Sequence, residues 1–147
     1  MSNSIVEIED TKCLFVFGYN AADSHPIVAR RIVKAKEKGA KIIVCDPRYI
    51  ETARLADLHL ALKNGSNIAL LNAIANVIIE EKLYDKSFIE NHTEQFDEYC
   101  QLVASYTPES VEKTTGLSAQ IIREAARMYA KAETATILWG MGVTQFY

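Results

Sequence analysis

The stretch CLFVFGYNAADSHPIVARRIVKAKEKGAKIIVC, residues 13–45, decides the fold of this chain. Its first five residues, 13–17, are all apolar and are followed by Gly18, which is typical of a strand buried on both faces. The run KIIVC at 41–45 is a second strand of the same kind. The distance between them fits a helical crossover, so the two strands are expected to be parallel neighbours in a right-handed βαβ unit.

The segment between these strands has the marks of an amphipathic helix. Ser24 is expected to cap it, and the first turn tolerates Pro26. Apolar residues then recur at helical spacing, the charged residues face water, and Gly39 ends the helix.

Further along, strand-like and helical segments alternate again. Residues 51–56 predict a short helix, 58–62 a third strand, and 67–81 a largely buried helix. Short, more polar helices are expected over 85–132, and residues 136–139 predict the last strand.

The composition fits one domain spanning residues 1–147. Apolar residues make up 49% and charged residues 24%, and the net charge of -3 argues against a nucleic-acid partner or a polybasic membrane anchor. The longest apolar stretch, 68–79, is too short to span a bilayer. The three cysteines are odd in number and far apart, which favours a reducing, cytoplasmic location. We therefore expect an α/β protein with an open, mainly parallel Rossmann-like sheet, helices on both faces, and a helical insert before the last strand.

Polar residues and glycines follow each predicted strand, at the sheet edge where ligands bind in this architecture. Asp46 lies 28 residues after Gly18 (46 − 18), roughly where an acidic residue takes the ribose hydroxyls in dinucleotide folds. The same carboxylate suits the N–H donors of guanine, and Arg48 suits phosphate. The sequence therefore predicts a nucleotide site. Its strand-end residues are Gly18, Asn20, Asp23, Asp46, Arg48, Lys63, Gly65, Asn67, Gly140, Gly142, Thr144 and Gln145.

Each signal also has a purely structural interpretation. Gly18 can simply end a strand, and residues 46–48 can be a surface turn. Asn67 can be a helix cap, residues 140–142 a flexible exit, and His25 a solvated histidine rather than a phosphate contact. The groups of residues that follow the four predicted strands nevertheless all fall at one edge of the predicted sheet.

Other chemistries find little support. No G-x-G-x-x-G follows the first strand, which argues against an NAD cradle, and the nucleophile elbow G-x-S-x-G is absent. The histidines and cysteines share no metal-ligand spacing, and Cys45 is expected to be a small buried hydrophobe. We therefore expect neither a catalytic residue nor a metal ligand in this chain.

Four segments, in this order and with this spacing, resemble those of the molybdopterin oxidoreductase family. They are FGYNAADSHP at 17–26, CDPR at 45–48, LKNGSN at 62–67 and WGMGVTQ at 139–145. The long match at 139–145 favours the catalytic alpha subunits of molybdopterin-dependent formate dehydrogenases, and the resemblance covers essentially the whole chain.

The resemblance implies that the chain binds one guanosine end of a bis-molybdopterin guanine dinucleotide that carries molybdenum or tungsten. It places Asn20 and Asp23 at the phosphate and pterin side, and Asp46 and Arg48 at the guanosine. The cofactor-binding residues expected in full are Gly18, Asn20, Asp23, Ser24, His25, Asp46, Arg48, Lys63, Gly65, Asn67, Gly140, Met141, Gly142 and Gln145.

For the complete enzyme, the resemblance implies oxidation of formate to CO2, with two electrons leaving through a 4Fe-4S cluster. The family has a cysteine-rich iron–sulfur segment, a cysteine or selenocysteine metal ligand and further domains, none of which is found in these 147 residues. We therefore expect one domain of a larger oxidoreductase, inactive alone. Its partners would be the remaining domains of the alpha subunit and its electron-transfer subunits.

The residues alone also leave two functions of another class open. One is a stand-alone guanine-nucleotide-binding module without catalysis. The other is a docking module whose basic stretch, residues 30–38, binds an acidic partner.

Overall fold

The computed structural model describes residues 3–145, which divide into two compact units. Unit 1 consists of residues up to 62 and from 132 onward, and unit 2 of Lys63–Lys131.

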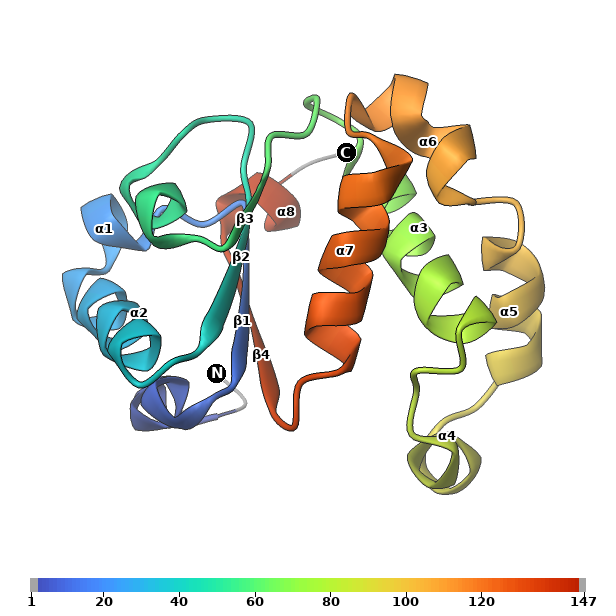
Figure 1. The fold of residues 1–147 in the computed structure, drawn as a ribbon, viewed down its shortest axis with the longest axis horizontal. Helices are drawn as coiled ribbons and strands as arrows, with labels where there is room; N and C mark the ends of the chain where they lie inside the picture. The colour runs from blue at the N-terminus through green and yellow to red at the C-terminus, as the bar shows by residue number, and fades with distance from the viewer. Residues whose placement is uncertain (1–2, 146–147) are drawn as a thin grey trace. The chain divides into compact units, whose positions relative to one another are not determined.

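Unit 1 is built around a four-stranded, all-parallel sheet. Its strands are β1 (Cys13–Phe17), β2 (Lys41–Cys45), β3 (Leu58–Leu60) and β4 (Ala135–Trp139), in the order β3-β2-β1-β4 (Figure 1). The predicted α/β class and parallel sheet are confirmed. The third strand ends two residues earlier than expected, because the N–H of Leu62 turns back to the carbonyl of Leu60.

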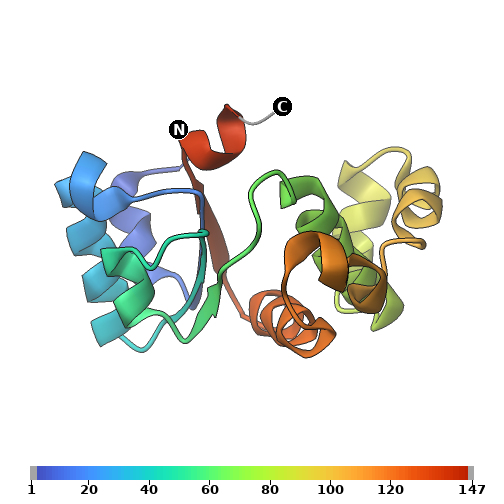
Figure 2. The same cartoon turned by 90° about the horizontal axis from the view of Figure 1, so that it is seen from above.

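Two 3-10 helices and three α-helices accompany this sheet in the described residues. They are the 3-10 helices η1 (Ile5–Asp10) and η2 (Glu51–Leu55), and the α-helices α1 (Ala21–Ser24), α2 (Pro26–Glu37) and α8 (Met141–Thr144). Seen from above, η1, α1 and α2 lie on one face of the sheet (Figure 2). The prediction that Ser24 caps the helix between the first two strands, which is α2, is wrong. Its hydroxyl donates to the carbonyl of Asn20 within α1, and His25 stands at the cap position of α2.

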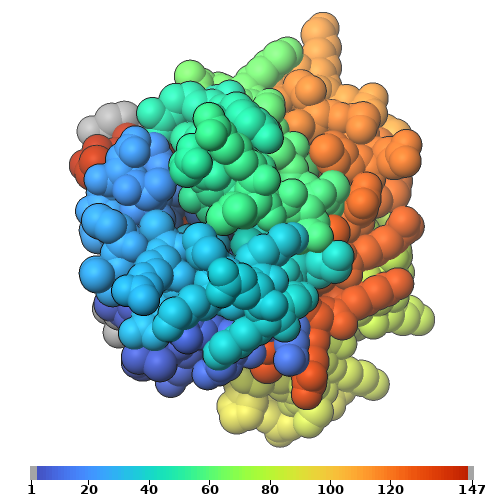
Figure 3. Space-filling view, turned by 60° about the vertical axis from the view of Figure 1, so that its left-hand side comes forward, coloured from blue at the N-terminus to red at the C-terminus, as the bar shows by residue number. Residues whose placement is uncertain are grey.

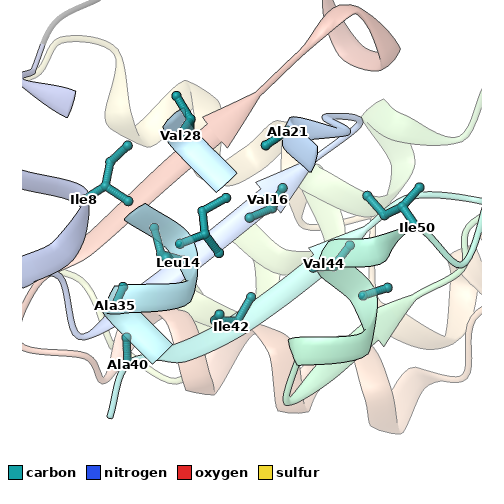
Figure 4. Packing of buried hydrophobic residues seen from close by; sticks show 12 residues of the cluster. Ile8, Leu14, Val16, Ala21, Val28, Ala35, Ala40, Ile42, Val44 and Ile50 are labelled. Carbon is teal, nitrogen blue, oxygen red and sulfur yellow. The ribbon is translucent and has the colours of Figure 1, made fainter. Parts of the chain in front are cut away.

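The core of unit 1 lies between the sheet and α2. Leu14 and Val16 of β1 and Ile42 and Val44 of β2 point into it, together with Ala35 (Figure 4). All five side chains are fully buried, as expected when an apolar helix stripe covers central parallel strands. The opposite surface of α2 faces water (Figure 3).

Unit 2 is the helical insert predicted before the last strand. It contains α3 (Asn67–Glu80), α4 (Lys86–His92), α5 (Phe96–Val103), α6 (Pro108–Thr115) and α7 (Ala119–Ala130). The apolar α3 packs against α5, α6 and α7. None of the helices in residues 3–145 is both long and apolar enough to cross a membrane.

Candidate functional site

The loop after β1 is organised by two polar side chains. The backbone N–H of Gly18 donates to the carbonyl of Cys45 at 2.8 Å, which holds the start of the loop against β2. The Asn20 amide then donates to the carboxylate of Asp23 at 2.6 Å. Among the described residues, the other end of that amide, Asn20 Oδ1, is buried without a hydrogen-bond partner. An orphaned buried acceptor is costly, so this oxygen needs a donor from outside the loop.

Ser24 and His25 lie at the exposed end of the same loop. His25 Nδ1 is 3.0 Å from the Ser24 hydroxyl, and its ring packs on Tyr19 with centroids 5.4 Å apart. Burial raises the pKa of the Tyr19 phenol, so this group remains a hydrogen-bond donor at neutral pH. Tyr19 was not singled out from the sequence, although it lies inside the segment 17–26 that carries the family resemblance.

The loop after β2 presents a buried carboxylate beside an exposed cation. Asp46 is only 3% exposed, and its Oδ1 accepts from the backbone N–H of Arg48 at 2.9 Å and from Arg48 Nε at 3.4 Å. The Arg48 side chain itself is 70% exposed. This arrangement confirms that residues 46–48 form a turn, and it also leaves the guanidinium accessible to an anion.

Two aromatic residues near Asp46 were missed from the sequence. His59 Nε2 lies 2.9 Å from the Asp46 carbonyl and so ties β3 to this loop. The exposed ring of Tyr49 stands edge-on to His59, with centroids 5.4 Å apart. The sequence does contain a sign of the role of His59, because it is the only polar residue in the predicted strand 58–62.

Three glycines allow the loops after β1 and β4 to touch through their backbones. The N–H of Gly142 donates to the carbonyl of Gly18 at 3.1 Å. A Cβ on Gly142 would lie 2.9 Å from Gly18 Cα, and one on Gly140 would lie 2.8 Å from the Gly18 carbonyl oxygen. Both approaches are closer than real Cβ atoms tolerate, so close packing alone requires these glycines.

The interpretation of residues 140–142 as a flexible exit is not supported, because Gly140 holds the cap position of the short helix α8 and residues 141 and 142 belong to it. Met141 is 69% exposed, and the Gln145 N–H donates to the Met141 carbonyl at 3.0 Å. The side chains of Met141 and Gln145 therefore remain available at this end of unit 1.

The remaining three predicted residues belong to unit 2. Lys63 Nζ donates to the carbonyl of Lys113 at 3.0 Å, and Gly65 occupies a left-handed turn with φ +83°. The cap interpretation of Asn67 is wrong. Ser66 holds the cap position of α3, with its hydroxyl bonded to the Lys63 carbonyl, and Asn67 is the first helical residue.

Eleven of the fourteen predicted residues thus gather at the carboxyl ends of β1, β2 and β4, joined through the contacts among Gly18, Cys45 and Gly142. Cys45 is fully buried there, and desolvation followed by the charge of Asp46 raises the pKa of its thiol well above the usual range. Such a thiol is unreactive. Within residues 3–145, no three His, Cys, Asp or Glu side chains come together as a metal site.

Comparison with known proteins identifies relatives of this chain. The family described as molybdopterin oxidoreductase matches residues 1–147. Formate dehydrogenase H of Escherichia coli is 69% identical over 147 residues, which are 100% of this chain and 21% of that protein. The F420-dependent formate dehydrogenase 1 subunit alpha of Methanococcus maripaludis is 51% identical over 99% of this chain and 22% of its own length.

A solved structure shares the fold as well. Acetylene hydratase from Pelobacter acetylenicus superimposes with a TM-score of 0.85 at 35% identity, over 94% of this chain and 20% of that one. The chain therefore spans about a fifth of the length of the relatives it matches. Because a hydratase and formate dehydrogenases share this part, the part alone does not define a substrate. The chain belongs to the molybdopterin oxidoreductase family.

Proposed function

We propose that this chain is the cofactor-binding domain of a formate dehydrogenase-like enzyme, and that it binds the guanosine end of a molybdopterin guanine dinucleotide. In this proposal units 1 and 2 together make up one domain. The observation that carries it is the buried carboxylate of Asp46 beside the exposed guanidinium of Arg48, at the carboxyl edge of a parallel sheet. Identity of 69% to formate dehydrogenase H supports the choice of enzyme.

Each side chain is suited to a different part of the ligand. The carboxylate of Asp46 can accept from the hydroxyls of ribose or from the N–H groups of guanine, and Arg48 can donate to a phosphate. Asp23 would repel a phosphate, so we assign it to an N–H or O–H donor of the pterin side. Gly65 and Asn67 would add contacts to the guanosine, and Lys63 would do so with the ammonium protons not used by Lys113.

The residues present fit such a ligand in one further respect. Asn20 Nδ2 is committed to Asp23, whereas its buried Oδ1 has no partner in the described chain. A hydroxyl or N–H of the cofactor would satisfy this acceptor. Gly18, Gly140 and Gly142 keep the neighbouring backbone free of side chains, with Ser24, His25, Met141 and Gln145 around it.

The cofactor would supply two-electron oxidation of formate to CO2 at a molybdenum or tungsten centre. The role of this chain is to hold and orient the dinucleotide tail, which fixes the position of the reacting end. The 4Fe-4S cluster and the electron-transfer subunits would be contributed by the rest of the enzyme. A cytoplasmic location is supported by three free thiols.

The test is a calorimetric titration of the chain with GDP, with ADP and NAD as controls. A single site at free ligand one hundred times the dissociation constant raises stability by about 2.7 kcal/mol, which a thermal shift also detects. We expect GDP binding that Asp46→Asn abolishes, while Asp57→Asn, which alters a carboxylate on the opposite end of the sheet, leaves it unchanged.

Equal binding of ADP and GDP would contradict a guanosine site. Binding that persists in the Asp46→Asn variant would contradict the role of this carboxylate. GDP binding with no metal-cofactor uptake by the full-length enzyme would instead favour the stand-alone nucleotide-binding module.

A further inference from the structure

Tyr49 is a large, mostly apolar side chain left uncovered at the carboxyl edge of the sheet. Its ring is 67% exposed and follows Arg48 directly in the loop after β2. The proposed function assigns Asp46 and Arg48 of this loop to the nucleotide and leaves the ring without a role. An exposed aromatic ring beside a site for a planar base is the arrangement in which stacking occurs.

The backbone on both sides of Tyr49 is fixed by hydrogen bonds. The N–H of Arg48 donates to Asp46 Oδ1 at 2.9 Å, and the N–H of Ile50 donates to the Arg48 carbonyl at 3.0 Å. The Ile50 side chain is buried and belongs to the core of unit 1. The loop therefore holds the start of the Tyr49 side chain close to the buried carboxylate of Asp46.

His59 of β3 braces the ring itself. Its Nε2 lies 2.9 Å from the Asp46 carbonyl oxygen, so the imidazole is tied to the same loop. The rings of Tyr49 and His59 meet edge to face, with centroids 5.4 Å apart and planes at 64°. This contact leaves at least one broad face of Tyr49 uncovered, in agreement with its exposure. A braced ring loses less conformational freedom when a ligand binds to it.

We propose that Tyr49 stacks on the purine base of the nucleotide and that His59 is the residue that positions its ring. Both roles rest on the proposed guanosine site, and they divide its work between two side chains. Guanine and adenine both present an aromatic face, so stacking on Tyr49 adds affinity without choosing the base. The choice of guanine comes from the N–H donors that the Asp46 carboxylate accepts.

Calorimetric titration of the chain with GDP and with ADP tests this division. Tyr49→Ala is expected to weaken GDP binding about tenfold or more. The ratio of GDP to ADP affinity should stay unchanged, because Asp46 is intact. Tyr49→Phe, which keeps the ring, should restore most of the lost affinity. The matched control is Tyr99→Ala in unit 2, which removes another exposed tyrosine and should leave GDP binding as it is.

The positioning role of His59 is tested through its coupling to Tyr49. His59→Gln removes the imidazole ring but keeps an N–H donor for the Asp46 carbonyl. It should weaken GDP binding by about 2- to 10-fold in the otherwise unchanged chain. In the Tyr49→Ala background the same substitution should change GDP affinity by less than about twofold, because the ring that it positions is already absent.

Four results would overturn all or part of the proposal. Unchanged GDP affinity in Tyr49→Ala, with binding still abolished by Asp46→Asn, would refute stacking while the guanosine site stood. A lower ratio of GDP to ADP affinity in Tyr49→Ala would mean that the ring only shapes the Asp46 loop. An equal effect of His59→Gln with and without the Tyr49 ring would refute positioning by His59. Absence of GDP binding by the wild type would overturn the guanosine site and the stacking together.

Discussion

In unit 1, the residues that pair are far apart in the sequence: Cys13 lies opposite Lys41 on one side and Ala135 on the other. In unit 2, three of the five helices begin with a local side-chain contact. Asp85, Thr107 and Ser118 cap α4, α6 and α7 with their own side chains. No such cap is found in the described parts of α1, α2 and α8 of unit 1.

This difference has a functional consequence. The helices α1, α2 and α8 of unit 1 begin at the predicted ligand edge, and their first N–H groups are not taken up by a capping side chain. In unit 2, side chains cap α4, α6 and α7, although not α3 and α5, and an ion pair joins Arg127 to Glu81. Unit 1 therefore keeps polar groups available for a ligand, and its stability depends on its buried strands.

The largest effect is expected from the core of unit 1. Leu14→Ala should lower its free energy of unfolding by about 2–5 kcal/mol, because Leu14 is fully buried between the sheet and α2. Urea unfolding followed by amide exchange in β2 and in α7 measures both units at once. Ile27→Ala, at 66% exposure, is the control and should change little. An equal loss of protection in β2 and α7 would show that the two units unfold together.

Glycine substitutions sharpen the comparison. Gly18→Ala should lower the free energy of unfolding by about 3 kcal/mol. It forces an alanine into the left-handed conformation of Gly18 (φ +55°) and places a Cβ 2.8 Å from the Gly142 carbonyl carbon. Gly65→Ala in unit 2 also has a positive φ but meets nothing within 4 Å, so about 1–2 kcal/mol is expected. Calorimetric melting of the two variants measures the difference. Equal costs would mean that the loop after β4 can move away from Gly18.

Acid should weaken unit 1 through Asp57. Although burial acts to raise its pKa, hydrogen bonds from Lys36, the Ile42 N–H and Lys41 lower the pKa from 3.8 to about 2. The stabilisation is therefore complete above about pH 4 and is lost as the pH falls towards 2. This stabilisation amounts to at most about 2 kcal/mol, and solvent screening at the exposed Lys41 reduces it further.

The measurement is stability against pH for the wild type and Asp57→Asn, whose curves should converge near pH 2. In unit 2, Glu81 also has a lowered pKa because of its hydrogen bond from Arg127, but the pair is exposed. Glu81→Gln should therefore change the pH dependence of stability less than Asp57→Asn does, and its effect should be smaller still in high salt. A larger effect from Glu81 would reverse this ranking.

The smallest effect is expected from the caps of unit 2. Ser118→Ala removes the acceptor for the Ile121 N–H and should cost about 1 kcal/mol. Ser24→Ala in unit 1 removes a hydroxyl that caps no helix, and a change below about 0.5 kcal/mol is expected. Thermal melting distinguishes them. Similar losses for both serines would mean that the two units do not differ in their dependence on caps.

The predictions from sequence were most accurate where the signal is local. Pro108 in the first turn of α6, Gly116 at its end and Ser118 at the start of α7 are residue types typical of these positions, within the range where short helices were expected. Ser24 and Asn67 were less predictable, because each is a good capping residue next to a helix start that another residue occupies. Cap chemistry is shared by neighbouring polar residues, so position alone did not select the right one.

The sequence by itself determined the alternation of buried strands and helices, the polar residues at strand ends and the family resemblance, since each is written in a few consecutive residues. Only the tertiary structure decided the order β3-β2-β1-β4, which leaves β4 with an open edge, and the contact that forces Gly18 and Gly142 to be glycines. It also showed that Asn20 Oδ1 is buried without a described partner. These features depend on backbone groups brought together from distant parts of the chain, which no local pattern encodes.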